Sequence, residues 1–146
     1  MGDFGGQRVQ SAVMPDSSRP QGSPLSSFHR TLRSFRFAGA GAVHVLRSQP
    51  NARVHVAVAL LACGMAAWLR LPAHAWALLL LAIALVLSLE AINTAVEFAI
   101  DLASPAQHPL ARAAKDAAAA AVLVSALLSV GVGACLFVPP ILARLG

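Results

Sequence analysis

Three carboxylates share one helical stripe of an otherwise apolar segment. After residue 16 the chain has only four carboxylates, which are Glu90, Glu97, Asp101 and Asp116. An α-helix turns about 100° per residue, so positions seven and eleven residues after Glu90 return to within about 20° of it. Asn93 lies at the edge of the same face. Ionisable groups at membrane depth cost free energy, so these side chains are candidates for function.

These residue types have the chemistry that phosphoryl transfer requires. Mg²⁺ commonly binds one or two carboxylates together with substrate phosphates. The chain's single lysine, Lys115, precedes Asp116 and can neutralise a phosphate. A second carboxylate can accept the proton of an attacking hydroxyl. Positioning, metal and charge stabilisation together serve phosphoryl transfer, although the sequence has neither a GxxxxGK[ST] phosphate loop nor a GxGxxG motif.

The composition is that of an integral membrane protein. Of the 146 residues, 58% are hydrophobic and 12% are charged, whereas soluble domains carry about 25% charged residues. The net charge of +5 comes mainly from arginines. In so apolar a chain these arginines indicate a membrane surface, and we expect no nucleic-acid partner. Cys63 and Cys135 lie in apolar runs and are expected to pack, not to form a disulfide or metal site.

Patterning along the chain predicts an all-α membrane protein. Residues 1–25 have the composition of a disordered tail. Residues 26–48 predict an amphipathic helix at the membrane surface, with a solvated helix as the alternative. The remainder, 26–146 with that helix included, is one membrane domain whose spans are predicted at about 54–71, 75–101 and 113–138. Prolines mark the predicted breaks, at Pro50, Pro72, Pro105, Pro109 and Pro139-Pro140.

Arginine and lysine positions predict the orientation. The N-terminal side and the region before the third span carry nine positive residues, against Arg70 and Arg144 on the other side. Cytoplasmic segments are enriched in such residues, so the N-terminus and the acidic stripe are expected to be cytoplasmic.

Several motifs resemble one known family. They are Glu90-Ala91-Ile92-Asn93-Thr94-Ala95-Val96-Glu97 with Asp101, His108-Pro109-Leu110-Ala111, and Ala114-Lys115-Asp116 with its Ala-rich continuation. From about Ser27 to the C-terminus, the chain resembles the prokaryotic diacylglycerol kinases and undecaprenol kinases. The resemblance implies a three-span lipid kinase of the bacterial inner membrane, usually a homotrimer with sites shared between subunits. It also implies Mg²⁺, ATP as co-substrate and a membrane lipid as substrate.

The resemblance assigns roles to individual residues. Glu90 matches the family's catalytic base, and Glu97 matches a Mg²⁺ ligand. The positions that match nucleotide or phosphate contacts are Arg30, Phe37, Asn93, Glu97, Asp101, Lys115 and Asp116.

One position departs from the family pattern. Where the family has an acidic metal ligand before the first span, this chain has Gln49, in Ser48-Gln49-Pro50-Asn51-Ala52-Arg53-Val54-His55. An amide oxygen can contact Mg²⁺ but brings no charge. The substitution predicts weaker metal binding and greater dependence on Glu97.

Two other functions stay open at this point. Aligned membrane carboxylates also build proton relays, so a proton-coupled carrier subunit is one alternative. A weakly active or inactive structural member of the kinase family, suggested by Gln49, is the other. Within the kinase interpretation the lipid is diacylglycerol or undecaprenol. The His108-Pro109-Leu110-Ala111 loop and the sequence context of His55 resemble the undecaprenol kinases more closely. His44, His55 and His74 are expected to be packing or interfacial residues.

Overall fold

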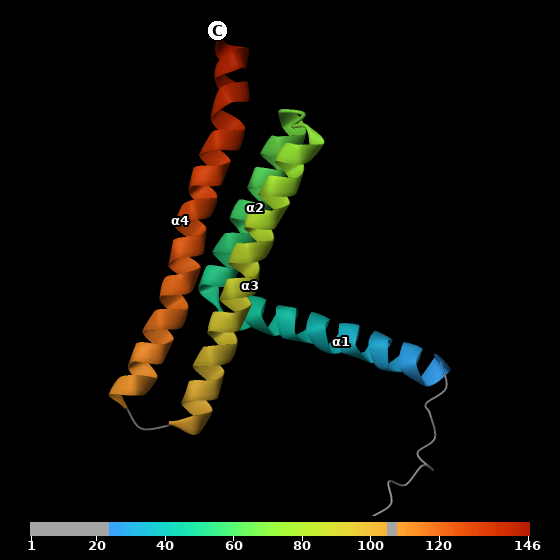
Figure 1. Ribbon diagram of the computed structural model, residues 1–146, viewed down its shortest axis with the longest axis vertical. Helices are drawn as coiled ribbons and strands as arrows, with labels where there is room; N and C mark the ends of the chain where they lie inside the picture. The colour runs from blue at the N-terminus through green and yellow to red at the C-terminus, as the bar shows by residue number, and fades with distance from the viewer. Residues whose placement is uncertain (1–23, 105–107) are drawn as a thin grey trace, which may run out of the picture. The chain divides into compact units, whose positions relative to one another are not determined.

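The computed structural model describes the backbone of residues 24–104 and 108–146, and the side chains from residue 33 onward with the same gap. Within these ranges the chain forms helices and no strands (Figure 1). The helices are α1 (Pro24–Ser48), α2 (Pro50–Trp68), α3 (Ala73–Ala103) and α4 (Pro109–Leu145). The predicted all-α class is confirmed. Residues 1–23 of the predicted tail lie outside the described part.

Helices α2, α3 and α4 are long and apolar enough to cross a membrane. They contain 19, 31 and 37 residues, which corresponds to about 28, 46 and 56 Å at 1.5 Å per residue. A bilayer core is about 30 Å thick. Helix α2 therefore has just the length of a span, whereas α3 and α4 have turns to spare for a polar site. The three predicted spans are confirmed as helices of this kind.

Proline and capping chemistry explains where two of these helices begin. Gln49 is extended, with φ −108° and ψ 113°, as expected for a residue before proline. Pro50 then starts α2, where its missing N–H costs no helical hydrogen bond. At the start of α4, His108 Nδ1 accepts a hydrogen bond of 3.2 Å from the Leu110 amide, and Pro109 follows in the first turn.

The end of α4 differs from the sequence-based expectation. The predicted third span stops at 138 because Pro139-Pro140 should break it, but α4 continues to Leu145. Proline has a helix-compatible φ near −65°, but it removes one hydrogen bond to the preceding turn and its ring crowds the carbonyl of residue i−4. Membrane helices tolerate such losses. Two prolines near a helix end therefore do not terminate it here.

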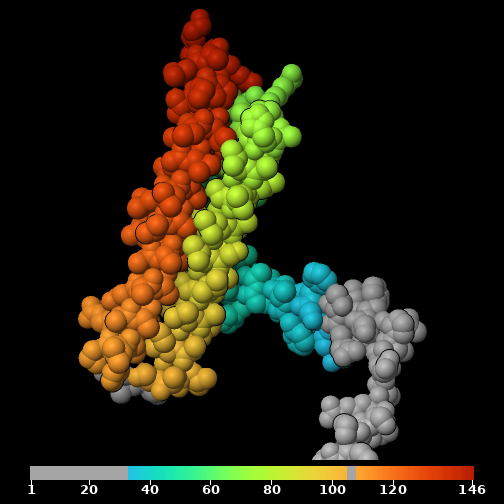
Figure 2. Space-filling model, in the orientation of Figure 1, coloured from blue at the N-terminus to red at the C-terminus, as the bar shows by residue number. Residues whose placement is uncertain are grey.

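The chain divides into two compact units at Arg36, and the site belongs to the unit Phe37–Gly146. In this unit α3 packs against both α2 and α4, and Figure 2 shows α3 and α4 in contact along their length. The buried positions are mostly small residues or lie along α3. Large apolar side chains such as Leu61 and Leu127 point outward, as suits a surface that faces lipid.

The far ends of α2 and α4 are joined by one arginine. The Arg144 guanidinium stacks on the Trp68 ring at 4.8 Å and donates a 3.3 Å hydrogen bond to the Trp68 carbonyl oxygen. Arg70, with a left-handed φ of 55°, follows directly in the turn between α2 and α3. Arg70 and Arg144 therefore lie at the same end of the bundle. The end of α4 is at the opposite end of the bundle from its start (Figure 1).

Candidate active site

The acidic stripe of α3 runs from the interior to the surface. Glu90 is 3% exposed, Glu97 is half-buried, and the Asp101 side chain is 64% exposed. The three carboxylates share a helix face, as the spacing predicts, but they have three different environments. A buried, a half-buried and a solvated carboxylate are suited to different tasks.

Two amides hold the Glu97 carboxylate. Asn93 Nδ2 donates a 3.0 Å hydrogen bond to Glu97 Oε1 from one turn earlier on α3. Gln49 Nε2 donates a 3.0 Å hydrogen bond to Glu97 Oε2 from the junction of α1 and α2. Nearby, His44 of α1 packs edge-on against Phe98 with ring centroids 5.4 Å apart. Gln49 thus lies beside Glu97 although 48 residues separate them in the sequence.

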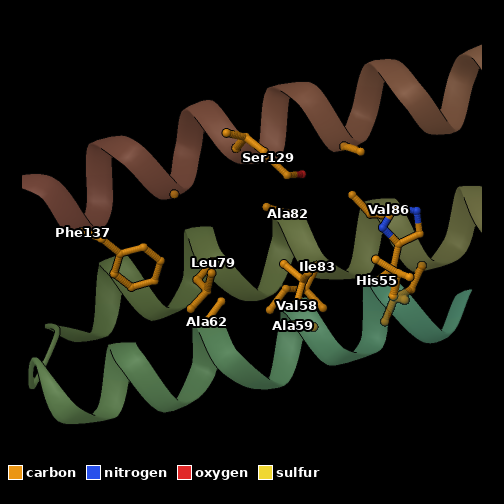
Figure 3. Close-up of a pocket in the computed structure, with 15 residues that line it drawn as sticks. His55, Val58, Ala59, Ala62, Leu79, Ala82, Ile83, Val86, Ser129 and Phe137 are labelled. Atoms are coloured by element: carbon orange, nitrogen blue, oxygen red, sulfur yellow. The ribbon is translucent and has the colours of Figure 1, made fainter. Parts of the chain in front are cut away.

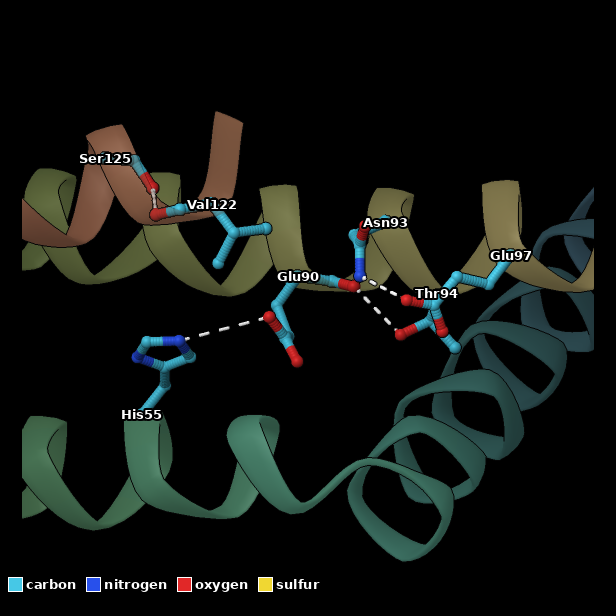
Figure 4. A network of polar contacts seen from close by, with 7 residues as sticks. All are labelled: His55, Glu90, Asn93, Thr94, Glu97, Val122 and Ser125. Atoms are coloured by element: carbon cyan, nitrogen blue, oxygen red, sulfur yellow. Dashed lines mark hydrogen bonds and ion pairs between the residues drawn. The ribbon is translucent and has the colours of Figure 1, made fainter. Parts of the chain in front are cut away.

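Glu90 faces a histidine of α2. The Nε2 atom of His55 lies 3.9 Å from Glu90 Oε2 (Figure 4). Thr94, itself buried, donates a 2.9 Å hydrogen bond to the Glu90 carbonyl. One carboxylate of the stripe therefore has an imidazole neighbour, whereas Glu97 is bound by neutral amides.

Glu90 and His55 line a cavity of about 280 Å³ between α2, α3 and α4. The other lining residues are Asn51, Val54, Asn93, Ala119, Val122, Leu123 and Ala126. Asn93 Oδ1 is buried and has no hydrogen-bond partner. A buried polar atom without a partner is unusual and suits a ligand or ion that supplies the missing contact.

An apolar groove of about 390 Å³ continues from this cavity. It is bounded by α2 and α4 and has α3 as its floor (Figure 3). Val54, His55 and Ala126 line both spaces. Phe137 lies at the other end of the groove from His55 (Figure 3). The buried acid is therefore at a junction of polar and apolar space.

Asp101 and Lys115 form an ion pair between the end of α3 and the first turns of α4. Asp116 instead faces Arg112 on its own helix, at 3.9 Å, and both side chains are largely exposed. The structure thus brings Lys115 to the acidic stripe but not Asp116, because successive helical residues point about 100° apart.

The last two candidate residues are on α1. The Arg30 side chain lies outside the described part of the structure. Phe37 is 62% exposed and lies about three turns before Gln49 on the helix.

Sequence comparison identifies the family. The family model for prokaryotic diacylglycerol kinase matches residues 36–137, which include Glu90, Glu97, Asp101 and Lys115. The chain belongs to the prokaryotic diacylglycerol kinase family. The resemblance stated from the motifs is confirmed.

Two relatives of the family have 40% identity or more. The chain is 43% identical over 113 residues to a diacylglycerol kinase of Synechocystis, covering 77% of this chain and 65% of that protein. It is 40% identical over 116 residues to an undecaprenol kinase of Bacillus subtilis, covering 78% of this chain and 93% of that protein. The chain thus spans slightly less than two thirds of the first relative and nearly all of the second.

The polar residues around Glu97 in this diacylglycerol kinase family member have the chemistry to hold a magnesium ion if phosphates supply its other ligands. Within the described residues, no three His, Cys, Asp or Glu side chains converge on one point. Mg²⁺ does not require such a cluster, because one or two carboxylates plus phosphates suffice. Glu97 supplies one carboxylate, and a half-turn of the Gln49 amide would present an oxygen in place of its nitrogen. The unpartnered Asn93 Oδ1 is a further oxygen in this region.

Two residues of the site were not predicted from the sequence. His55 was expected to be an interfacial or packing residue, and the structure places its Nε2 atom 3.9 Å from Glu90 Oε2. Asn51 was not considered as a site residue, yet it lines the same cavity as His55. Their spacing of four puts both on one face of α2. Two polar residues at that spacing on a span were the signal that could have identified them.

Proposed function

We propose that this family member is an ATP- and Mg²⁺-dependent lipid kinase that phosphorylates the hydroxyl of diacylglycerol or undecaprenol at the cytoplasmic face of the bacterial inner membrane. The observation that carries the proposal is the position of Glu90. Its buried carboxylate lines a cavity of mixed polar and apolar residues, and an apolar groove shares Val54, His55 and Ala126 with that cavity. A lipid alcohol has this combination, since its hydroxyl would meet the carboxylate while its hydrocarbon occupies the groove.

In this reaction Glu90 is the general base. The hydroxyl proton of the lipid goes to a Glu90 carboxylate oxygen as the lipid oxygen bonds to the γ-phosphorus of ATP. The bond from that phosphorus to the oxygen of ADP breaks. A dry site strengthens electrostatic interactions with the developing charge, and Glu90 is almost inaccessible to water.

Glu97, Asn93 and Gln49 would hold Mg²⁺ with the phosphates of ATP. When bound, the ion neutralises charge on the β- and γ-phosphates. Lys115 would exchange Asp101 for a phosphate, since a lysine contributes a mobile point charge. The family resemblance suggests four further nucleotide contacts, which are Asp101, Asp116, Arg30 and Phe37. Of these, Asp116 and Phe37 have exposed side chains, so the nucleotide would contact them at the protein surface.

A purified-protein assay tests this function. We expect phosphate to pass from ATP to diacylglycerol or undecaprenol in detergent or vesicles only when Mg²⁺ is present. The comparison of the two lipids assigns the substrate. Absence of transfer to either lipid, with ATP still bound, would favour an inactive structural member of the family.

A substitution in the groove tests whether the lipid binds there. Ala126 lines both the cavity and the groove, so Ala126→Phe should block their junction. We expect a raised KM for the lipid of about tenfold or more, with the affinity for ATP unchanged, since one misplaced contact can cost that much. The matched control is Leu127→Phe, which adds a ring at a 63% exposed position on the same helix. Equal effects of both variants would contradict lipid binding in the groove.

Orientation and assembly are parts of the proposal with their own tests. In a background without Cys63 and Cys135, we expect Ser11→Cys to be labelled from the cytoplasm and Gly146→Cys only from outside. The physical reason is the nine-to-two excess of positive residues. Labelling of Gly146→Cys from the cytoplasm alone would refute the orientation.

The homotrimer implied by the family resemblance stays a prediction. Cross-linking of the protein in vesicles would measure the number of subunits.

A further inference from the structure

We propose that His55 takes the catalytic proton from Glu90 and releases it to water. The inference rests on the proposed function, because it concerns the step that follows proton removal from the lipid hydroxyl. Glu90 is 3% exposed, so a proton bound there has almost no direct contact with solvent. The base must lose this proton before the next turnover.

His55 is placed to provide the path. Its Nε2 lies 3.9 Å from Glu90 Oε2, and its side chain is 22% exposed. A shift of about 1 Å would bring the two atoms to hydrogen-bond distance. Catalytic contacts are often this long before substrate binds. The imidazole therefore lines the same cavity as Glu90 and is more exposed than Glu90.

The other cavity walls offer no substitute. From α4 the lining residues are Ala119, Val122, Leu123 and Ala126, which are all apolar. From α2 and α3 the remaining lining residues are Asn51, Val54 and Asn93, which do not titrate. Glu97 is not among the lining residues, and both of its oxygens accept hydrogen bonds from amides. Among the residues that line this cavity, only Glu90 and His55 have side chains that can act as an acid or a base.

The proposed transfer conserves protons. The lipid O–H proton is on Glu90 once the lipid phosphate ester has formed. It passes to the Nε2 lone pair of a neutral His55 that carries its own proton on Nδ1. The imidazolium then releases the Nδ1 proton to water, and exchange of tautomers restores the starting form. Glu90 is again a carboxylate, and no redox partner is involved.

The test uses His55→Ala with imidazole added back. We expect kcat to fall by about 10²-fold, at the lower end of what positioned proton transfer contributes, with KM for ATP and lipid changed less than about threefold. Imidazole should restore at least part of kcat, because the shortened side chain enlarges an existing cavity. A residue that only packs would not be replaced in this way. His74→Ala is the matched control, because His74 is exposed near the start of α3, and it should keep normal kinetics.

A second background separates the outcomes. In Glu90→Gln the proton has no acceptor, so adding His55→Ala should cause no further loss, as expected for residues that act in one step. If the unmodified protein phosphorylates neither lipid, the proposed function fails. If it is active but His55→Ala keeps full kcat, or loses it without rescue by imidazole, only the role of His55 fails. Should His55→Ala not fold, His55→Gln measured for the same split between kcat and KM replaces it.

Discussion

Glu90→Gln is expected to abolish lipid phosphorylation while ATP binding persists. Glutamine keeps the size of the side chain at this 3% exposed position, but its amide cannot take a proton from the lipid hydroxyl. General-base catalysis contributes about 10² to 10⁴-fold, so turnover should fall by at least about 10²-fold. Radiolabelled phosphate transfer measures turnover, and calorimetric titration of the detergent-solubilised protein measures ATP affinity.

Turnover and ATP affinity together distinguish the loss of the catalytic base from unfolding of the protein. ATP should bind with unchanged affinity because the contacts proposed for the nucleotide are at other residues. These are Asn93 and Glu97, three and seven residues further along α3, and Lys115 on α4. Near-normal turnover of Glu90→Gln would show that another group removes the proton. Loss of ATP binding together with turnover would assign Glu90 to the nucleotide or metal instead.

Substitutions at Glu97 and Gln49 should change the magnesium requirement in opposite directions. Glu97→Gln removes the one carboxylate that is bonded to both Gln49 and Asn93, and we expect it to eliminate activity at any Mg²⁺ concentration. Gln49→Glu adds a second carboxylate next to Glu97, because the two side chains are now 3.0 Å apart. We expect the Mg²⁺ concentration for half-maximal rate to fall by about tenfold or more, since Mg²⁺ binds well between two carboxylates and phosphates.

The same Gln49→Glu variant has a stability signature. Without metal, two carboxylates in hydrogen-bond range repel each other, so Tm should decrease, and Mg²⁺ should restore it. Gln49→Ala is the matched control, because it removes the amide without adding charge and should not lower the Mg²⁺ requirement. An unchanged Mg²⁺ dependence in Gln49→Glu would mean that Gln49 is not at the metal site.

Helical periodicity made much of the site predictable. The spacing of Glu90, Glu97 and Asp101 fixes them to one face, because rotation along a helix is determined by sequence separation alone. The apolar runs likewise predict three spans, and Pro50 predicts the break between α1 and α2. These features are local, so no knowledge of packing is needed. The family motifs are local in the same sense.

Contacts between helices could not be obtained in this way. The Gln49 bond to Glu97 spans 48 residues, and the approach of His55 to Glu90 depends on how α2 rotates against α3. The separation of Asp116 from the stripe depends in turn on which face of α4 meets α3. A rotation of about 100° moves a neighbouring residue from an interface to the surface, so periodicity cannot decide such pairings.

The sequence by itself determined that this is an all-helical membrane protein of the prokaryotic diacylglycerol kinase family, with an acidic stripe on its second span. Only the tertiary structure decided that Glu90 is buried opposite His55, that amides hold Glu97, and that a groove between α2 and α4 leads to the cavity. The physical reason is that a residue's angular position around its own helix follows from its place in the sequence. Its burial and its hydrogen-bond partners depend instead on side chains of other helices, which come into contact only when the helices pack.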